Sequence, residues 1–288
     1  METTHNFTTI SPSARALLLL KGNTSIPYAL QAAEIISHPE KYIPGYADKS
    51  LAICLRIAHF EARYLSIDQL LSGLPVKNIL EVSSGFSFRG LDAIQQKDVY
   101  YIDTDLPGII EEKRKLVNAL QGEHHNAIGK LEILPLNALD ETTFMETANH
   151  FPAGEIAIVN EGLLMYLNIE EKEKLCSIIH KVLKQRGGYW ITADIYIKMP
   201  RFNTVIKMDD DLEKFLEQHN IEENKFDSME AAEAFFNKCG FLVDKEAEID
   251  YTKLAAMPFV MQKLTQEQMQ EMSKVGRPNA TWRLKIAQ

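Results

Sequence analysis

Three absences narrow the class of protein before any motif is considered. The 288-residue chain has only three cysteines, Cys54, Cys176 and Cys239, and no two of them form a CxxC pair. Cysteines this few and this far apart are typical of free thiols in a reducing compartment, not of a disulfide framework or a zinc site. His124 and His125 have no carboxylate or cysteine at metal-ligand spacing, so we expect no metal.

The chain also lacks a net positive charge and long apolar runs. The net charge is −9 and there is no basic run, which disfavours a nucleic-acid partner because phosphate binding depends on Lys and Arg. No window reaches the roughly 18 apolar residues that cross a bilayer. Residues 1–22 have no basic stretch before their short leucine run, unlike a signal peptide. We therefore expect a cytoplasmic protein with no membrane partner.

The most informative stretch begins at an apolar strand, residues 79–82. A turn of small residues follows, Ser83-Ser84-Gly85, and then helical spacing over 86–94. A second strand, 99–102, ends at Asp103-Thr104-Asp105. Small residues let a ligand approach the backbone, a helix start offers free N–H groups, and an acid after the second strand can accept ribose hydroxyls. The pattern predicts a nucleotide-type site, and an ordinary βαβ unit without a ligand is the alternative.

Glycine is missing from two positions of this loop. Ser83 and Phe88 stand where the dinucleotide fingerprint needs glycine, so NAD and an NAD-linked reductase are disfavoured. A mononucleoside ligand without a pyrophosphate, such as S-adenosylmethionine, fits the loop better.

Helical and strand patterns alternate along the rest of the chain. Strand-like runs occupy 131–136, 155–159, 189–194, 240–243 and 281–286. Helical spacing is found at 13–20 and in a stretch that follows residues 26–30 and ends at 36. It is also found at 51–71, 107–122, 142–150, 170–184, 198–218, 228–238 and 266–274. This alternation predicts an α/β fold with a doubly wound, seven-stranded, Rossmann-like sheet. We expect residues 1–75 to form a helical cap segment, residues 76–288 the core, and about 198–238 a cap insertion.

Polar residues follow each predicted central strand. They are Ser83 and Gly85, Asp103 and Asp105, Asn137 with Ala138, and Asn160 and Glu161. The carboxyl ends of parallel strands meet at one edge of the sheet, where α/β proteins bind ligands. The alternative is that Asp and Asn simply suit turns and helix caps.

Three segments carry a resemblance to a known family. They are Phe60-Glu61-Ala62-Arg63, then Glu81 to Phe86 followed by Tyr101 to Pro107, and Asn160-Glu161-Gly162-Leu163-Leu164-Met165-Tyr166-Leu167. The sequence resembles the leucine carboxyl methyltransferase family, and most closely its bacterial branch of polyketide-type O-methyltransferases. The resemblance implies a class I methyltransferase sheet with a helical cap, S-adenosylmethionine as cofactor, and a small-molecule substrate methylated on a carboxylate or hydroxyl.

The resemblance also implies roles for single residues. Arg63 corresponds to an arginine that pairs with the cofactor carboxylate, a task that suits a guanidinium fork. Ser83 and Gly85 fall in the loop under the methionine part, and Glu161 matches an acid near the methionine amine. Two aspartates and an amide complete the set.

Asp105 matches the aspartate that holds the ribose, while strand position alone favours Asp103, so both are kept. Asn137, with Ala138 beside it, matches a position that bonds the adenine amino group. The family loop is usually Gly-Ala-Gly followed by Asp-Thr-Arg. Here Ser83-Ser84-Gly85 and Ser87-Phe88-Arg89 replace it, which motivates an alternative: a non-catalytic nucleotide-binding or interaction protein that keeps the fold.

The residues around the methyl acceptor are less well defined by the sequence. Tyr28 and Tyr46 are candidates to line a substrate pocket, with core packing as the alternative. His59 is expected to be an ordinary helix histidine. The sequence shows no general base, which favours a carboxylate or an acidic phenol as acceptor because neither needs one. It identifies no catalytic residue and leaves the oligomeric state open.

Overall fold

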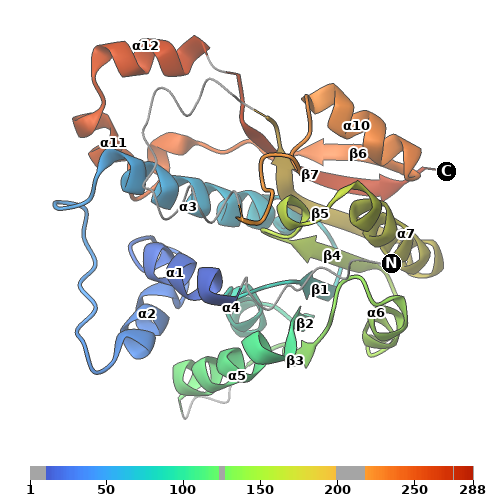
Figure 1. Cartoon of the computed structure of the whole chain (residues 1–288). Helices are drawn as coiled ribbons and strands as arrows, with labels where there is room; N and C mark the ends of the chain where they lie inside the picture. The colour runs from blue at the N-terminus through green and yellow to red at the C-terminus, as the bar shows by residue number, and fades with distance from the viewer. Residues whose placement is uncertain (1–10, 123–126, 199–217, 275, 288) are drawn as a thin grey trace.

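One mixed sheet organises the chain (Figure 1). The computed structural model describes residues 11–122, 127–198, 218–274 and 276–287. Within these ranges seven strands lie in the order β3-β2-β1-β4-β5-β7-β6, which confirms the doubly wound, seven-stranded sheet. The strands are β1 Asn78–Val82, β2 Tyr100–Asp105, β3 Lys130–Pro135, β4 Ile156–Asn160, β5 Gly188–Tyr196, β6 Phe241–Glu246 and β7 Asn279–Ile286.

The register of the central strands brings their carboxyl ends to one edge. Strands β1 to β5 pair in parallel, and only β7 runs antiparallel, between β5 and β6. Val82 is paired with Asn160, and Asn160 in turn with Thr192. The residues that follow β1, β4 and β5 therefore emerge side by side, as the sequence predicted for a ligand-binding edge.

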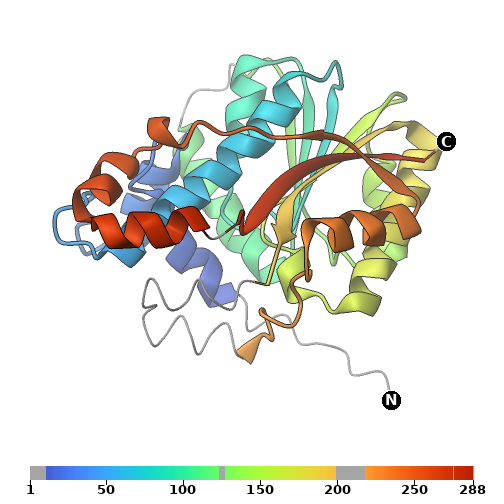
Figure 2. The same cartoon turned by 90° about the horizontal axis from the view of Figure 1, so that it is seen from above.

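Helices cover both faces of the sheet (Figure 2). One apolar core lies under α6, α7 and α10, and a second lies under α1 to α5. A smaller cluster joins α3 to α11. The helices are α1 Ser11–Lys21, α2 Ala29–Ser37, α3 Leu51–Ser72, α4 Arg89–Gln96, α5 Pro107–Gln121, α6 Glu141–Ala148, α7 Ile169–Arg186, α10 Met229–Lys238, α11 Met257–Lys263 and α12 Gln266–Lys274.

Local signals explain where several helices begin. Ser50 accepts the Ile53 N–H at the start of α3, and Asp140 accepts the Thr143 N–H at the start of α6. Asn168 caps α7 and belongs to a complete capping box. Each such cap contributes about 1 kcal/mol to helix stability, because it satisfies N–H groups that have no partner within the helix.

The structure corrects some predicted boundaries. Helix α4 begins at Arg89 and not at Phe86, because the chain first makes a turn in which the Ser87 N–H bonds the Ser84 carbonyl. Sequence analysis missed α11, which is only seven residues long. The predicted helix at 198–218 lies almost wholly outside the described residues, whereas the one at 228–238 is confirmed as α10. The domain division at residue 75 stays a prediction.

Within the described ranges, no helix is both long enough and apolar enough to span a membrane.

Candidate functional site

The loop after β1 is shaped by two residues with left-handed backbone. Ser83 has a φ of 53° and Gly85 a φ of 51°. The Gly85 N–H donates to Asp105 Oδ2 at 2.7 Å, and the Leu106 N–H donates to Asp105 Oδ1 at 2.7 Å. A Cβ built on Gly85 would make an ordinary van der Waals contact with Ala14 at 3.9 Å. The loop therefore fixes the Asp105 carboxylate at the tip of β2.

Asp103 has an internal partner instead. Its buried carboxylate accepts from Lys113 Nζ at 2.6 Å, and the same ammonium donates to Ser84 Oγ at 2.7 Å. Burial raises the pKa of the Asp103 carboxyl, although Lys113 opposes the shift. Burial also raises the pKa of Asp105, opposed by the N–H groups of Gly85 and Leu106. Since Lys113 occupies Asp103, Asp105 is the better placed of the two to meet a ligand.

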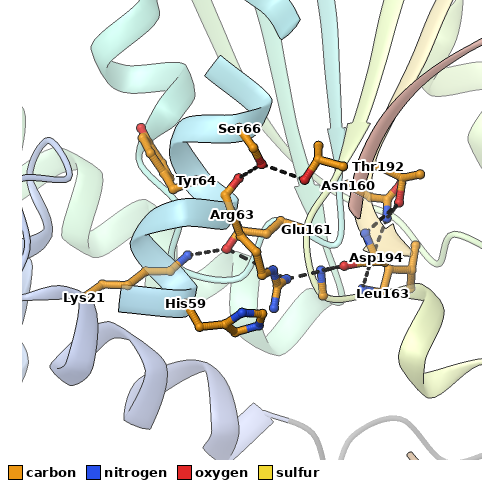
Figure 3. A network of polar contacts seen from close by, with 12 residues as sticks. Lys21, His59, Arg63, Tyr64, Ser66, Asn160, Glu161, Leu163, Thr192 and Asp194 are labelled. Atoms are coloured by element: carbon orange, nitrogen blue, oxygen red, sulfur yellow. Dashed lines mark hydrogen bonds and ion pairs between the residues drawn. The ribbon is translucent and has the colours of Figure 1, made fainter. Parts of the chain in front are cut away.

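Glu161, directly after β4, lies among three cations, two of which, Lys21 and Arg63, are labelled in Figure 3. Its oxygens are 2.7 Å from Lys21 Nζ, 3.2 Å from Arg89 Nη2 and 3.9 Å from Arg63 Nη2. Burial alone would raise the pKa of the Glu161 carboxyl, but the charges of Lys21, Arg63 and Arg89 outweigh it and hold the pKa at about 2. Glu161 is therefore ionised at neutral pH and can accept an additional donor.

Arg63 projects from α3 toward this edge and is 5% exposed. Its Nη2 donates to Asp194 Oδ1 at 3.4 Å, a long contact, and its Nε is buried without a hydrogen-bond partner among the described residues. A buried guanidinium N–H left unpaired is costly, so an orphaned donor at a sheet edge marks a place for an acceptor.

Asp194 on β5 fixes the loop that carries Glu161. Its carboxylate accepts the N–H of Gly162 at 2.6 Å, of Leu163 at 2.7 Å and of Leu164 at 3.1 Å. It also accepts from Asn160 Nδ2 at 2.7 Å. These four donors, together with Arg63 Nη2, hold the loop after β4 in one conformation and thereby aim Glu161.

Arg89 ties the loop after β1 to α3. Its guanidinium donates to the Tyr64 carbonyl at 3.1 Å, pairs with Asp68, and lies 3.9 Å from the Tyr64 ring centroid. Its Nε is 3.6 Å from a Glu81 oxygen. Arg89 also reaches Glu161 at 3.2 Å, a contact that the sequence did not predict.

Sequence analysis missed Lys21, Arg89, Lys113 and Asp194 as parts of this network. Asp194 had a usable signal, since it lies at the carboxyl half of a predicted strand. Lys21 and Lys113 had none, because a helical lysine is ordinarily a solvated surface residue.

Asn137 and Ala138 follow β3 at the same edge. Asn137 is exposed, and its Oδ1 accepts the Leu139 N–H at 3.0 Å, as in an Asx turn. Ala138 is buried in the first core. Their contact with an adenine stays a prediction.

Tyr28 and Tyr46, the two predicted pocket residues, make packing contacts. Tyr28 packs against the second core, where burial and then Asp92 of α4 raise its pKa. Tyr46 stacks on Phe259 with centroids 4.4 Å apart, and its hydroxyl donates to the Asn23 carbonyl. These are the contacts of the core-packing alternative, and a place in a substrate pocket stays a prediction.

No group of three or more potential ligands within the described ranges can hold a metal ion.

Comparisons with known proteins bear on the fold. No model of a known protein family matches the chain, and no curated protein matches it. A DUF574 family protein from Streptomyces avermitilis is similar, with a TM-score of 0.51 and 12% identity over 96% of this chain and 97% of the other.

Two further solved structures are less similar. A magnesium protoporphyrin IX methyltransferase from Synechocystis with bound SAH has a TM-score of 0.47 and 9% identity, covering 91% of this chain and 96% of that chain. LepI in complex with SAH and a substrate analogue has a TM-score of 0.45 and 9% identity over 77% of this chain, which spans 46% of the LepI chain. The topology and the similarity to the DUF574 protein together establish an α/β fold with a doubly wound, seven-stranded sheet.

Proposed function

We propose that this chain is an S-adenosylmethionine-dependent O-methyltransferase that acts on a small molecule. One observation carries the proposal: Arg63, Asp105 and Glu161 gather at the carboxyl edge of the sheet, with Arg63 and Glu161 3.9 Å apart. These three residues offer what the methionine carboxylate, the ribose and the methionine amine each require.

The charges at this edge suit an amino-acid zwitterion. The orphaned Nε of Arg63 and the ammonium of Lys21 can bind a carboxylate, and the Glu161 carboxylate can accept an ammonium. A zwitterion adds no net charge to the site, and each of its two charges meets groups of opposite charge there.

The loop after β1 suits the nucleoside part. Two backbone N–H groups orient the Asp105 carboxylate, which keeps lone pairs for ribose hydroxyls. Gly85 has no side chain, which lets a ligand approach the backbone of this loop closely. Asn137 and Ala138 lie after the adjacent strand β3, where an adenine in this orientation would reach.

A bound S-adenosylmethionine supplies a sulfonium methyl group that is already activated for displacement. The chain then has to align the acceptor oxygen with that carbon and keep water out, and positioning of this kind contributes about 7–11 kcal/mol in favourable cases. We propose a polyketide-like acceptor within the leucine carboxyl methyltransferase family, methylated on a carboxylate or a hydroxyl.

A methyl-transfer assay tests this proposal. The full chain is incubated with S-adenosylmethionine carrying a radioactive methyl group and with paired aromatic acceptors, naphthol and naphthoate. Methyl esters release volatile methanol in alkali, whereas methyl ethers do not, so the two acceptor classes are separated. Protein that binds the cofactor yet labels neither class would support the non-catalytic alternative.

A further inference from the structure

A histidine and a tyrosine next to the candidate site form a pair that the proposed cofactor contacts do not use. His59 lies on α3 one turn before Arg63, and Tyr196 is the last residue of β5. His59 Nε2 is 2.8 Å from the Tyr196 hydroxyl, and the ring centroids are 5.7 Å apart. Figure 3 shows the His59 ring beside the Arg63 guanidinium. The pair thus lies at the same edge of the sheet as Arg63 and Glu161.

Charged groups surround this pair from several elements. Arg56 and Arg63 from α3, Glu161 after β4, and Lys225 before α10 all act on His59. Tyr196 is under the influence of Asp194 as well, and its ring lies 5.7 Å from the Arg63 guanidinium. The centroid of the Phe60 ring lies 5.6 Å from that of His59.

This environment keeps both rings neutral at neutral pH. Burial and the neighbouring Arg63 charge lower the pKa of His59 to about 3, against the opposing effect of Glu161. Burial raises the pKa of the Tyr196 hydroxyl, although Arg63 opposes that shift. Two tautomers of the neutral imidazole can make this bond: Nε2 accepts the tyrosine O–H, or Nε2–H donates to the tyrosine oxygen. Only the first can pass a proton from Tyr196 to His59. In it the tyrosine oxygen can accept from Arg63 and from one further donor.

We propose that His59 and Tyr196 together accept the proton of a hydroxyl acceptor during methyl transfer. This inference rests on the proposed function and refines it, since a carboxylate acceptor is already ionised and needs no such pair. The substrate class is therefore an alcohol of the phenol or enol type.

The step balances in atoms and charge. The acceptor O–H bond breaks, its proton passes to the Tyr196 oxygen, and Tyr196 passes its own proton to His59 Nε2. The acceptor oxygen forms a bond to the methyl carbon while the carbon–sulfur bond breaks and its electron pair stays on sulfur. The positive charge lost at the sulfonium reappears on the imidazolium, near Glu161. His59 then releases the proton to water.

Three variants test the proposal. His59→Gln keeps a hydrogen-bonding side chain opposite Tyr196 but cannot take up a proton in the working range of pH. Tyr196→Phe removes the hydroxyl. His180→Gln is the matched control, because His180 lies on α7 against Phe241 on the other face of the sheet. Thermal melting and S-adenosylmethionine binding are measured first for all three, and each variant should retain both.

The decisive readout is how methylation depends on acceptor ionisation. With naphthol, His59→Gln and Tyr196→Phe should lower kcat/KM about 10²-fold, as for loss of a general base, and His180→Gln should not. With para-nitrophenol at alkaline pH, which is already ionised, the loss should nearly vanish. In His59→Gln the naphthol rate should rise with pH as the phenol ionises, whereas the wild-type rate should stay flat.

A readout without turnover complements the kinetics. With S-adenosylhomocysteine bound, naphthol should shift the NMR signals of the His59 ring, and naphthoate should not.

The outcomes distinguish a failure of this inference from a failure of the proposed function. No cofactor binding by wild-type protein would end the proposed function itself. Cofactor binding with methylation of naphthoate alone, or of no hydroxyl acceptor, would overturn the role of the pair. Equal loss with naphthol and para-nitrophenol would overturn it too, because that result means only positioning.

Discussion

Lys21 Nζ lies 2.7 Å from Glu161 Oε1, although 140 positions separate the two residues in the chain. Helix α1 thereby reaches the carboxyl edge of the sheet, next to Arg63 and Arg89. The N-terminal segment consequently contributes a charge to the candidate site.

The first prediction concerns the contact between Lys21 and Glu161. Lys21→Met should weaken S-adenosylmethionine binding about tenfold, since one of two cations for the methionine carboxylate is lost. Methylthioadenosine, which has no amino-acid part, should bind the variant and the wild type equally. Competition calorimetry measures both affinities, and a parallel loss for the two ligands would remove Lys21 from carboxylate binding.

Arg63 should matter more than Lys21, because its guanidinium is buried and one N–H has no partner. Arg63→Met should cost about 2–5 kcal/mol of S-adenosylmethionine binding and little for methylthioadenosine. Arg186→Met is a matched control, since Arg186 Nε is also unpartnered among the described residues but lies at the end of α7, before β5 begins. Unchanged binding by Arg63→Met would exclude this arginine from the site.

The two aspartates of β2 should separate cleanly. Asp105→Ala should weaken S-adenosylmethionine and methylthioadenosine alike, by about tenfold or more, because both ligands carry the ribose. Asp103→Asn should leave both affinities near those of the wild type, since Lys113 occupies that carboxylate. The reverse result would transfer the ribose role to Asp103.

A further prediction concerns the stability that the pair of Lys113 and Asp103 provides. Lys113→Met leaves a buried carboxylate unpaired and should lower the free energy of unfolding by about 3–5 kcal/mol. The double variant Asp103→Leu/Lys113→Met should recover most of that loss. Denaturant unfolding measures both, and additive losses in the double variant would show that the pair is not coupled.

Glu161 should make the free energy of unfolding fall at acid pH. Its pKa falls from an ordinary 4.5 to about 2 on folding, so its stabilisation is present above pH 4.5 and is lost as the pH falls toward 2. The shift corresponds to about 3 kcal/mol. Glu161→Gln should lower the free energy of unfolding at neutral pH by about this amount and flatten its acid dependence. Glu170→Gln, an exposed change on α7, is the control.

The strands and their edge could be predicted because the information is local. Apolar runs such as 156–160 identify buried strands, and parallel pairing then collects the residues that follow them. The sequence also shows that Ser83 stands where the dinucleotide fingerprint has glycine. That the backbone of Ser83 is left-handed became apparent only in the structure.

Contacts between distant side chains could not be predicted in the same way. Nothing in the residues around Lys21 or His59 indicates the partners, Glu161 and Tyr196, because helix and strand packing alone brings them together. The choice between Asp103 and Asp105 likewise depended on Lys113, one helix away.

Calorimetric titration of the full chain with S-adenosylmethionine tests the central claim most directly. The account predicts saturable binding at one site per chain, competition by methylthioadenosine, and no competition by NAD. The absence of heat at millimolar S-adenosylmethionine, with the chain folded, would contradict it.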